Sequence, residues 1–350
     1  MLNLTIFLQN KTSFAAAIFA ASVLGFSHDH AAAADCPSED FGKFLAAYSA
    51  DTATAQRHTA STLNMLALKP ATGTDAFAPQ TTRVTKAGLT FPLMAPITAT
   101  RNQGIEVEPV DDKHITVVDK RAGNSNIKIF NFAREACWVL EGVEDWSIDA
   151  KDIPASSNAH MSTAENLCYQ RARTFGRLGG LQQYALTGEF FEAALENYVC
   201  AAASGDPQAS LNAASLSLSG MASQLDTPKV EALFKAAATT LADGASSLST
   251  FYCYGNTTLP EGTCRQPALA EKELIRAVSM GSVDAANYLG YAFEQGLMVT
   301  KDAYRALACY QLAAAKGNKT AAANLVRLQA LVADADRPSQ CLTPSTQGSS

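Results

Sequence analysis

The sequence predicts an α+β domain in its N-terminal half, followed by an all-α solenoid of helix pairs in its C-terminal half. Between residues 104 and 143, segments rich in β-branched and aromatic residues are separated by short polar connections, which is typical of an antiparallel meander. From Thr163 onward the chain is rich in alanine and repeats with a period of 36 residues, as Leu289 and Leu325 illustrate. Such a period is typical of stacked supersecondary units.

The first residues have the pattern of an export signal. Lys11 precedes an apolar run over residues 14–26, and Ala32 to Ala34 supply the small residues that a signal peptidase requires. The apolar run has about 13 residues, whereas a helix that spans a bilayer needs about 20. We therefore expect a signal peptide over residues 1–34, a mature chain that begins at or near Asp35 without stable membrane insertion, and a periplasmic or secreted location.

All the cysteines lie beyond the expected cleavage site. They are Cys36, Cys137, Cys168, Cys200, Cys253, Cys264, Cys309 and Cys341. An even number of cysteines in an exported chain predicts disulfides, although eight cysteines allow 105 pairings. The sequence has no C-x-x-C motif, and the histidines of the expected mature chain, His58, His114 and His160, are scattered, so we expect no zinc site and no cofactor.

One cysteine pair is predicted from local sequence. Cys253 and Cys264 are the closest pair along the chain, and the residues between them include Gly255 and Pro260, which favour a sharp turn. The pairings Cys36 with Cys137, Cys168 with Cys200 and Cys309 with Cys341 follow only from domain membership and elimination.

The α+β domain is expected to occupy residues 35–153. We expect a helix with Phe41, Phe44 and Tyr48 on one face, a helix-tolerant polar segment over 51–68, and a loop marked by Pro70 and Pro79. The predicted strands are 104–110, 114–120, 126–134 and 137–143, and the predicted core contains Phe41, Phe44, Ile129, Phe130, Trp138 and Leu140. The order of helix and meander, with C-W-x-L in the last strand, is similar to the NTF2-like cone fold of exported bacterial proteins.

The solenoid is expected to occupy residues 160–335, after a linker around 153–158. The predicted helix pairs are 163–204, 207–242, 244–280 and 283–316, with a capping helix over 319–334. The last residues, 336–350, contain prolines and several Ser, Thr and Gln residues, so we expect a disordered tail.

One complete repeat unit lies between residues 284 and 325. It contains A-x-x-L-G, then G-x-x-V-x-K-D, then A-x-x-x-Y-x-x-A-A-x-x-G-N, and this order resembles the Sel1-like repeat. The residues that fit are Ala286, Leu289, Gly290, Gly296, Val299, Lys301, Asp302, Ala306, Tyr310, Ala313, Ala314, Gly317 and Asn318. We expect Gly296 to end the first helix, Thr300 to cap the second, and Gly317 to end it. The resemblance implies an α-solenoid related to tetratricopeptide arrays, which usually serves as a protein-binding scaffold.

Charge and motifs narrow the function. The formal charge of −6 and the absence of a basic stripe argue against a nucleic-acid partner. The partner that the Sel1-like resemblance implies is another protein. The sequence has no G-x-S-x-G, no H-E-x-x-H and no glycine-rich phosphate loop, which leaves no catalytic residue to name.

Two clusters of carboxylates are the remaining candidates for acid–base chemistry. The first is Glu106, Glu108, Asp111 and Asp112 near His114, and the second is Glu141, Glu144, Asp145, Asp149 and Asp152 around Trp146. Charged residues in such positions are mostly solvated, and we interpret both clusters in that way.

The main alternative is a cell-envelope enzyme or small-molecule-binding protein with its site in the N-terminal domain. For this alternative, the resemblance to cysteine-rich Sel1-like proteins implies hydrolytic activity on cell-wall or β-lactam-like substrates. A buried ionisable cluster beneath Trp138 would favour this alternative, whereas a filled apolar core would favour the scaffold. A third possibility is a structural envelope protein with no discrete ligand.

Overall fold

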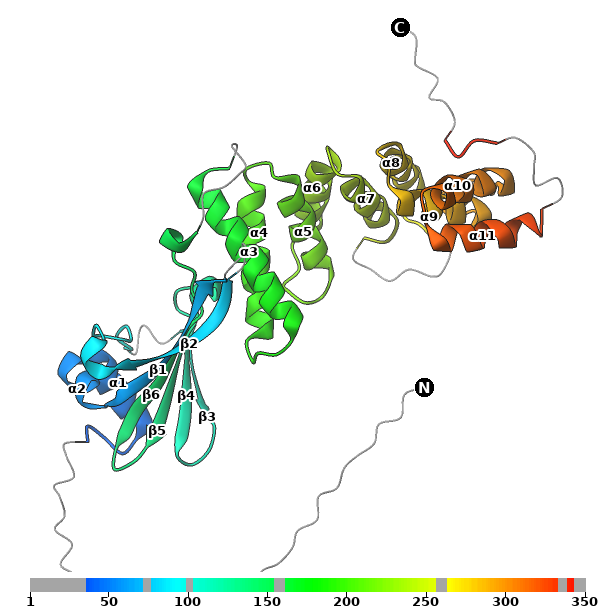
Figure 1. The fold of residues 1–350 in the computed structure, drawn as a ribbon. Coiled ribbons are helices and arrows are strands. Elements are labelled where there is room, and N and C mark those ends of the chain that lie inside the picture. Colours follow the sequence, from blue (N-terminus) through cyan, green and yellow to red (C-terminus); the bar gives the residue numbers. More distant parts are fainter. Residues whose placement is uncertain are drawn as a thin grey trace, which may run out of the picture.

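The computed structural model describes residues 36–71, 77–98, 103–153, 161–255, 263–332 and 339–342. The expected signal peptide over 1–34, the linker from residue 154 onward, and the tail except for residues 339–342 lie outside these ranges. Figure 1 shows a β-sheet at one end of the molecule and a row of helices that leads away from it. The α+β half followed by an all-α half is the predicted fold class.

The N-terminal half contains two helices and a six-stranded sheet. The elements are α1 (Phe41–Ala50), α2 (Thr52–Arg57), β1 (Thr59–Pro70), β2 (Phe77–Thr85), β3 (Ile105–Pro109), β4 (His114–Asp119), β5 (Lys128–Arg134) and β6 (Trp138–Asp145). The strand order is β2-β1-β6-β5-β4-β3. Strands β3 to β6 form the predicted antiparallel meander, while β1 pairs with β6 in parallel, so the whole sheet is mixed.

The expectation of helix-tolerant structure over residues 51–68 was wrong beyond Arg57. Residues 59–70 form β1, which lies between β2 and β6. Pairing on both sides outweighs the weak local preference of this polar segment, because strand stability depends on its neighbours more than on intrinsic propensity. Pro79, expected in a loop, lies within β2 at the edge of the sheet, where a missing N–H is tolerated.

The two faces of the sheet support different cores. On one face, α1 and α2 cover a cluster that includes Phe44, Phe130, Trp138 and Leu140, all buried as predicted. Ile129 was expected in the same core, but it lies in a second cluster on the opposite face. The reason is the alternation of side chains along β5, which sends neighbouring residues to opposite faces.

The C-terminal half consists of consecutive helix pairs. They are α3 (Thr163–Leu181) with α4 (Thr187–Ala202), α5 (Pro207–Leu218) with α6 (Thr227–Ala238), α7 (Ala242–Tyr254) with α8 (Pro267–Ser279), and α9 (Val283–Gln295) with α10 (Ala303–Ala315), followed by α11 (Lys319–Gln329). Short polar side chains begin most of these helices by accepting a backbone N–H. Such N-caps are Asp206, Asp226, Ser282, Asp302 and Asn318.

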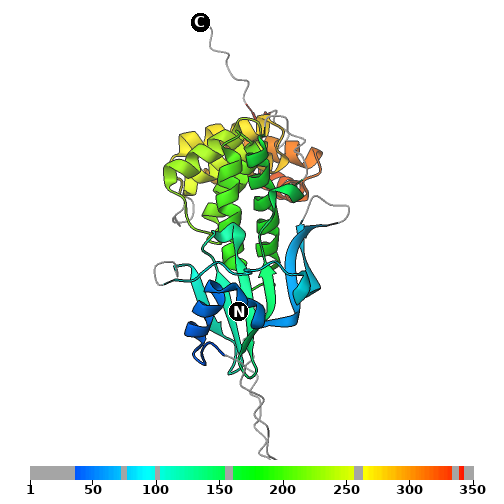
Figure 2. The ribbon, with the colours of Figure 1, turned by 90° about the vertical axis from the view of Figure 1, so that its left-hand side faces the viewer.

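The first helix pair of the solenoid packs directly on the sheet. Phe175 and Phe190, from α3 and α4, are fully buried together with Trp146, Val118 and Ile129 from the sheet side. Figure 2 shows α3 and α4 in green, standing over the end of the sheet. The sheet is therefore covered by the N-terminal helices on one face and, over part of the other, by the solenoid itself.

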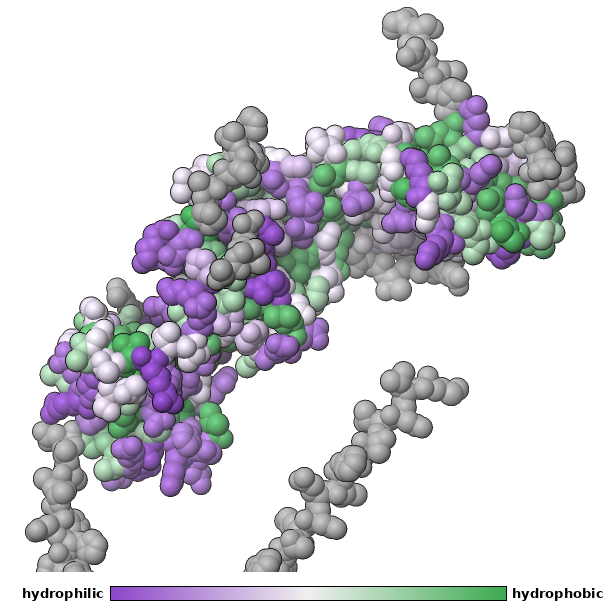
Figure 3. Space-filling model, viewed as in Figure 1, coloured by the Kyte–Doolittle hydropathy of each residue, from purple (hydrophilic) through white to green (hydrophobic). Residues whose placement is uncertain are grey.

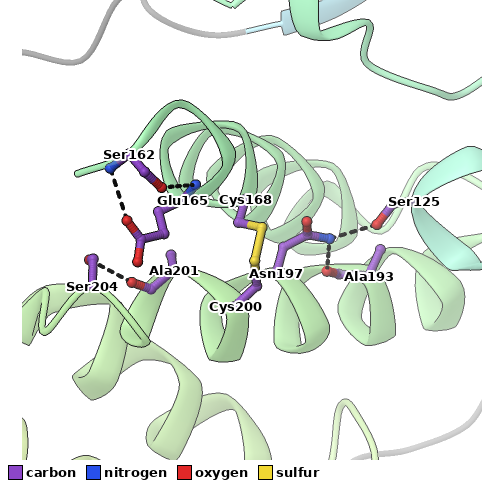
Figure 4. The surroundings of a disulfide bond; sticks show 9 residues. All are labelled: Ser125, Ser162, Glu165, Cys168, Ala193, Asn197, Cys200, Ala201 and Ser204. Carbon is purple, nitrogen blue, oxygen red and sulfur yellow. Dashed lines mark hydrogen bonds between the residues drawn. A yellow bond between two sulfur atoms is a disulfide. The ribbon is translucent and has the colours of Figure 1, made fainter.

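Polar contacts reinforce this junction. The Asn197 side chain on α4 donates to Ser125 Oγ at 2.6 Å and to the Ala193 carbonyl at 2.7 Å (Figure 4). Lys120 Nζ lies 2.8 Å from Glu106 and 2.6 Å from Glu189 on α4. The junction thus combines an apolar centre with hydrogen-bonded edges, as in protein interiors.

Candidate protein-binding surface

The repeat unit over 284–325 forms a closely packed helix pair. Gly290 on α9 faces the ring of Tyr310 on α10, and a Cβ at residue 290 would lie 2.8 Å from that ring. Ala306 and Ala313 on α10 are fully buried. Small residues at these positions let the two helices approach closely, which is a structural role rather than a chemical one.

The ends of these helices follow the sequence with one exception. Gly296 is the C-cap of α9 and has φ of 75°, a left-handed conformation that glycine adopts without steric cost. The N-cap of α10 is Asp302, whose side chain accepts from the backbone N–H groups of Tyr304 and Arg305 at 3.0 Å. The expectation that Thr300 would cap this helix, with Asp302 in its first turn, was therefore wrong.

A polar network joins α9, α10 and α11. The Tyr310 hydroxyl donates to Glu294 Oε2 at 2.8 Å, and Arg327 donates two hydrogen bonds of 2.7 Å to the same carboxylate. The hydrogen bonds from Arg327 lower the pKa of Glu294, while burial raises the pKa of Tyr310. Glu294 is therefore held as an anion that fixes three helices relative to one another.

Tyrosine and asparagine side chains form a surface across α7, α9 and α11. The hydroxyls of Tyr254 and Tyr288 lie 3.3 Å apart, and the rings of Tyr288 and Tyr291 stack with centroids 6.2 Å apart. Asn324 on α11 donates to Asn287 on α9 at 3.3 Å. Tyr291 is 41% exposed. We call these five residues the tyrosine–asparagine surface; the sequence reasoning identified none of them, because helical spacing made the tyrosines look like ordinary core residues.

Four disulfides distribute over the described chain. They are Cys36–Cys137, Cys168–Cys200, Cys253–Cys264 and Cys309–Cys341. Cys168–Cys200 joins α3 to α4, as Figure 4 shows. Cys253–Cys264 closes the connection between α7 and α8, and the turn residues from 256 to 262 lie outside the described residues. Cys168–Cys200 is the pair that joins two described helices, whereas Cys253 on α7 and Cys309 on α10 are bonded to cysteines outside the helices, and Cys36–Cys137 joins two non-helical positions.

Trp138 lies in a filled apolar core. Its ring packs edge-on against Phe41 with centroids 5.0 Å apart, and its indole N–H donates to the Glu39 carbonyl at 3.4 Å. The buried cluster around it is apolar and aromatic, apart from His58, whose ring lies 5.5 Å from that of Phe44, and Thr59, whose hydroxyl lies 2.8 Å from that of Tyr48. This is the arrangement that favours the scaffold over an enzymatic site beneath Trp138.

The first carboxylate cluster separates into ordinary surface interactions. Asp111 contacts His114 Nδ1 at 2.8 Å, with about half of each side chain exposed, and this hydrogen bond lowers the pKa of Asp111. Glu106 pairs with Lys120. These groups act as solvated partners of nearby residues, as the sequence interpretation held.

In the second carboxylate cluster, Asp145 and Asp149 form ion pairs with lysines, whereas Glu144 has neutral hydrogen-bond donors. Asp145 contacts Lys128 at 2.9 Å, and Asp149 contacts Lys151 at 2.7 Å. Glu144 instead accepts from the indole N–H of Trp146 at 3.1 Å and from the Asn131 amide at 3.4 Å.

Glu144 contributes to a shallow pocket on the sheet. The pocket has a volume of about 220 Å³ and is lined by Asn64, Leu66, Thr81, Asn131, Glu141, Gly142, Val143 and Glu144. Asn131 is oriented by Thr116, whose hydroxyl donates to its side-chain oxygen at 3.0 Å. The lining offers two carboxylates, of Glu141 and Glu144, and two amides, of Asn64 and Asn131, that can bind a small polar molecule.

Two further properties concern the described residues only. They contain no group of three or more His, Cys, Asp or Glu side chains placed to hold a metal ion. In the same ranges, no helix is both long and apolar enough to cross a bilayer.

Comparison with known proteins gives only structural similarity. No family model matches the sequence, and no curated protein matches it. A Sel1 repeat protein from Oxalobacter formigenes is 24% identical, with 46% of this chain and 64% of that chain covered and a TM-score of 0.36. A protective antigen from uropathogenic Escherichia coli with an SLR fold is 22% identical, with 48% of this chain and 36% of that chain covered and a TM-score of 0.38.

A third similar structure is described as a sel1 repeat protein from Klebsiella pneumoniae subsp. pneumoniae. It is 17% identical, with 48% of this chain and 82% of that chain covered and a TM-score of 0.29. The present chain spans less than two thirds of the first two proteins. The resemblance of the N-terminal half to NTF2-like domains stays a prediction. Over just under half of its length, this chain is similar to Sel1 repeat proteins.

Proposed function

We propose that this chain is an exported, non-enzymatic scaffold that binds another protein through the solenoid over residues 160–335. The observation that carries the proposal is the continuous apolar core that runs from α4 to α11. Because each helix pair packs on the next, the outer sides of several pairs form one extended surface. Such a surface is suited to a macromolecular partner.

The tyrosine–asparagine surface is the part of the solenoid that we assign to partner binding. Tyrosine is enriched at protein interfaces because it combines a large apolar ring with a hydrogen-bonding hydroxyl. Tyr291 projects far enough to be 41% exposed, while Tyr288 and Tyr254 support it from behind by stacking and hydrogen bonding. A rigid aromatic anchor of this kind loses little conformational entropy on binding.

A pull-down from the native envelope tests the assignment to the solenoid. The baits are the full chain, each half alone, and the full chain lacking residues 282–325. We expect the full chain to capture a partner and the deletion to lose it, because the deletion also removes the neighbour on which the preceding pairs stack. Capture of the same partner at full affinity by residues 36–150 alone would overturn the scaffold proposal.

A pair of point variants then tests the surface itself. Tyr291→Ala removes the exposed ring, and Leu269→Ala removes an apolar side chain of similar exposure on α8, at 41% and 42% respectively. We expect the first to weaken capture and the second to leave it unchanged. Equal capture by both variants would exclude the tyrosine–asparagine surface as the binding site.

Export is supported by the Lys11 and 14–26 pattern together with the cysteine usage. Four disulfides fit an oxidising compartment such as the periplasm or the extracellular space. Export and partner binding are parts of the same proposal. The pull-down tests partner binding, and the mass of the mature chain tests export.

A second candidate function is small-molecule binding at the sheet pocket. The specific observation in its favour is the Thr116–Asn131–Glu144–Trp146 hydrogen-bond network, which orients a carboxylate and an amide at the pocket wall. Glu144→Gln keeps the shape of the pocket and removes the carboxylate charge that this network orients, while Glu141 stays in place. A ligand from an envelope extract that protects the wild-type protein against thermal unfolding but not this variant would support the second function.

A further inference from the structure

The outer face of α11, the last helix in the described part of the chain, carries apolar side chains. Val326 is 68% exposed, and Ala322, Ala323 and Ala330 on the same side are exposed as well. The helix buries Ala321 and Leu328, which lie on its opposite side. Figure 3 shows hydrophobic residues gathered over α11 at the right-hand end of the molecule, with hydrophilic residues between them. Terminal units of a solenoid normally present a polar outer face, so the exposed apolar side chains of α11 indicate a surface that binds another element.

The 36-residue period identifies the kind of element that fits this face. Ala322 and Val326 of α11 correspond to Ala286 and Gly290 of α9. In α9 these positions are buried, because Gly290 packs against Tyr310 of α10. The exposed stripe of α11 is therefore the stripe that, one unit earlier, receives the second helix of the pair.

The described C-terminal segment of this chain occupies a different place. Residues 339–342 are held on α10, where Cys341 is bonded to Cys309 and its carbonyl accepts from Arg305 at 3.1 Å. Val326 remains exposed with this segment in position. None of the described residues covers Val326, which leaves this face accessible to a helix of another molecule.

Charge indicates what that molecule carries. From residue 316 to residue 332 the chain contains Lys316, Lys319 and Arg327 and no acidic residue. All three basic residues are exposed, but Arg327 is already paired with Glu294, so Lys316 and Lys319 supply the positive charge of this face. The α11 of a second copy placed on this face would bring like charges together, whereas a helix with acidic residues beside its apolar stripe would be complementary.

We propose that α11 docks an amphipathic, acidic α-helix of a partner protein, which completes the fifth helix pair. Val326 replaces Gly290 of the earlier unit, so the docking helix has a small residue where α10 has Tyr310. The interaction uses the apolar stripe of α11, with basic side chains beside it. This surface is distinct from the tyrosine–asparagine surface, and each can fail without the other.

The probe is a labelled synthetic peptide based on α10, the helix that covers the equivalent face one unit earlier. It has the sequence of residues 303–315 with the changes Cys309→Ser, Tyr310→Ala, Arg305→Glu and Gln311→Glu. A lactam bridge on its outer side keeps it helical, since short isolated helices are marginal in water. A control peptide carries lysine at the two positions where the probe carries glutamate.

Fluorescence anisotropy with the full oxidised chain gives the result. We expect saturable binding of the acidic peptide, and binding weaker by about tenfold or more for the lysine peptide and for the protein variant Val326→Glu. Val110→Glu is the matched control, because Val110 is 67% exposed on the N-terminal half, and it should bind as wild type does. Ala322→Glu gives a second test on the same face if Val326→Glu fails to fold.

Three outcomes would overturn the proposal. The first is equal binding by wild type and by both α11 variants. The second is no binding of the acidic peptide up to about 1 mM. The third is concentration-dependent dimerisation of the wild type in sedimentation, lost in Val326→Glu, which would assign the face to a second copy. None of these outcomes bears on partner capture through the tyrosine–asparagine surface, which the Tyr291→Ala pull-down tests.

Discussion

Replacing Phe190 with alanine should weaken both halves of the protein together. Phe190 is fully buried at the junction, and its ring centroid lies 5.0 Å from Trp146 on the sheet side and 5.9 Å from both Phe175 and Tyr184. A buried Phe→Ala change costs about 3–5 kcal/mol, and each lost aromatic pair adds to the effect. We expect a loss of about 4 kcal/mol, a large share of the roughly 5–15 kcal/mol that stabilises a typical domain.

Urea unfolding in a Trp138→Phe background measures this loss. In that background the fluorescence reports Trp146 at the junction, while circular dichroism at the helix band reports the solenoid. We expect Phe190→Ala to shift the native emission of Trp146 to the red and to lower both transition midpoints. Phe234→Ala is the control, since Phe234 is 2% exposed and packs with Phe251 inside the solenoid, 5.7 Å away.

The control should destabilise the helices and leave the native emission of Trp146 unchanged. The packing argument would be refuted if Phe190→Ala cost less than about 1 kcal/mol, or if its native emission matched that of the parent protein. Either result would mean that the sheet and the first helix pair do not share a core.

Three further predictions follow from the solenoid and the export signal. A double Cys253→Ser, Cys264→Ser variant should lose on the order of 3 kcal/mol in chemical unfolding, and peptide mapping without reductant should recover these two cysteines linked, so an alkylated free thiol would contradict the pairing. Because Arg327 lowers the pKa of Glu294, this ion pair stabilises the folded state above pH 4.5, the ordinary glutamate value, and the stabilisation is lost as the pH falls below that value. Glu294→Gln should flatten this part of the profile of unfolding free energy against pH. An unchanged profile would count against the network. Intact mass should place the mature N-terminus at or near Asp35, and recovery of residues 1–30 in membrane-bound material would contradict cleavage.

The helical half was predictable because its signal is local. Alanine-rich helical spacing and the 36-residue period locate α9 and α10 nearly to the residue, and Gly296 ends α9 as expected. Close packing of Gly290 on Tyr310 explains why the period is strict here, since a larger residue at 290 would collide with the ring.

The sheet was only partly predictable because its remaining signal is non-local. The meander β3 to β6 is visible in short hairpin-like segments, whereas β1 pairs both with β2, the next strand in sequence, and with β6, far away in sequence. The tyrosine–asparagine surface was missed for a related reason. Whether a tyrosine at helical spacing is buried or exposed depends on which helix stands beside it.

The junction between the halves was also hidden. The composition around residues 153–158 suggests a linker between independent domains, and Trp146 and Phe190 look like members of separate cores. In the structure they share one core. Sequence patterns assign residues to a face of an element, but they do not say which element meets that face.

The order of the disulfides along the chain has a consequence for biosynthesis. Each cysteine pairs with the next one in sequence, first Cys36 with Cys137 and last Cys309 with Cys341. Of the 105 ways to pair eight cysteines, this one alone joins the first, third, fifth and seventh cysteine along the chain each to the cysteine that follows it. A chain that emerges from its N-terminus therefore presents each thiol with its native partner before any later competitor appears. An oxidant that joins thiols in their order of arrival is sufficient, and no isomerase has to reshuffle them.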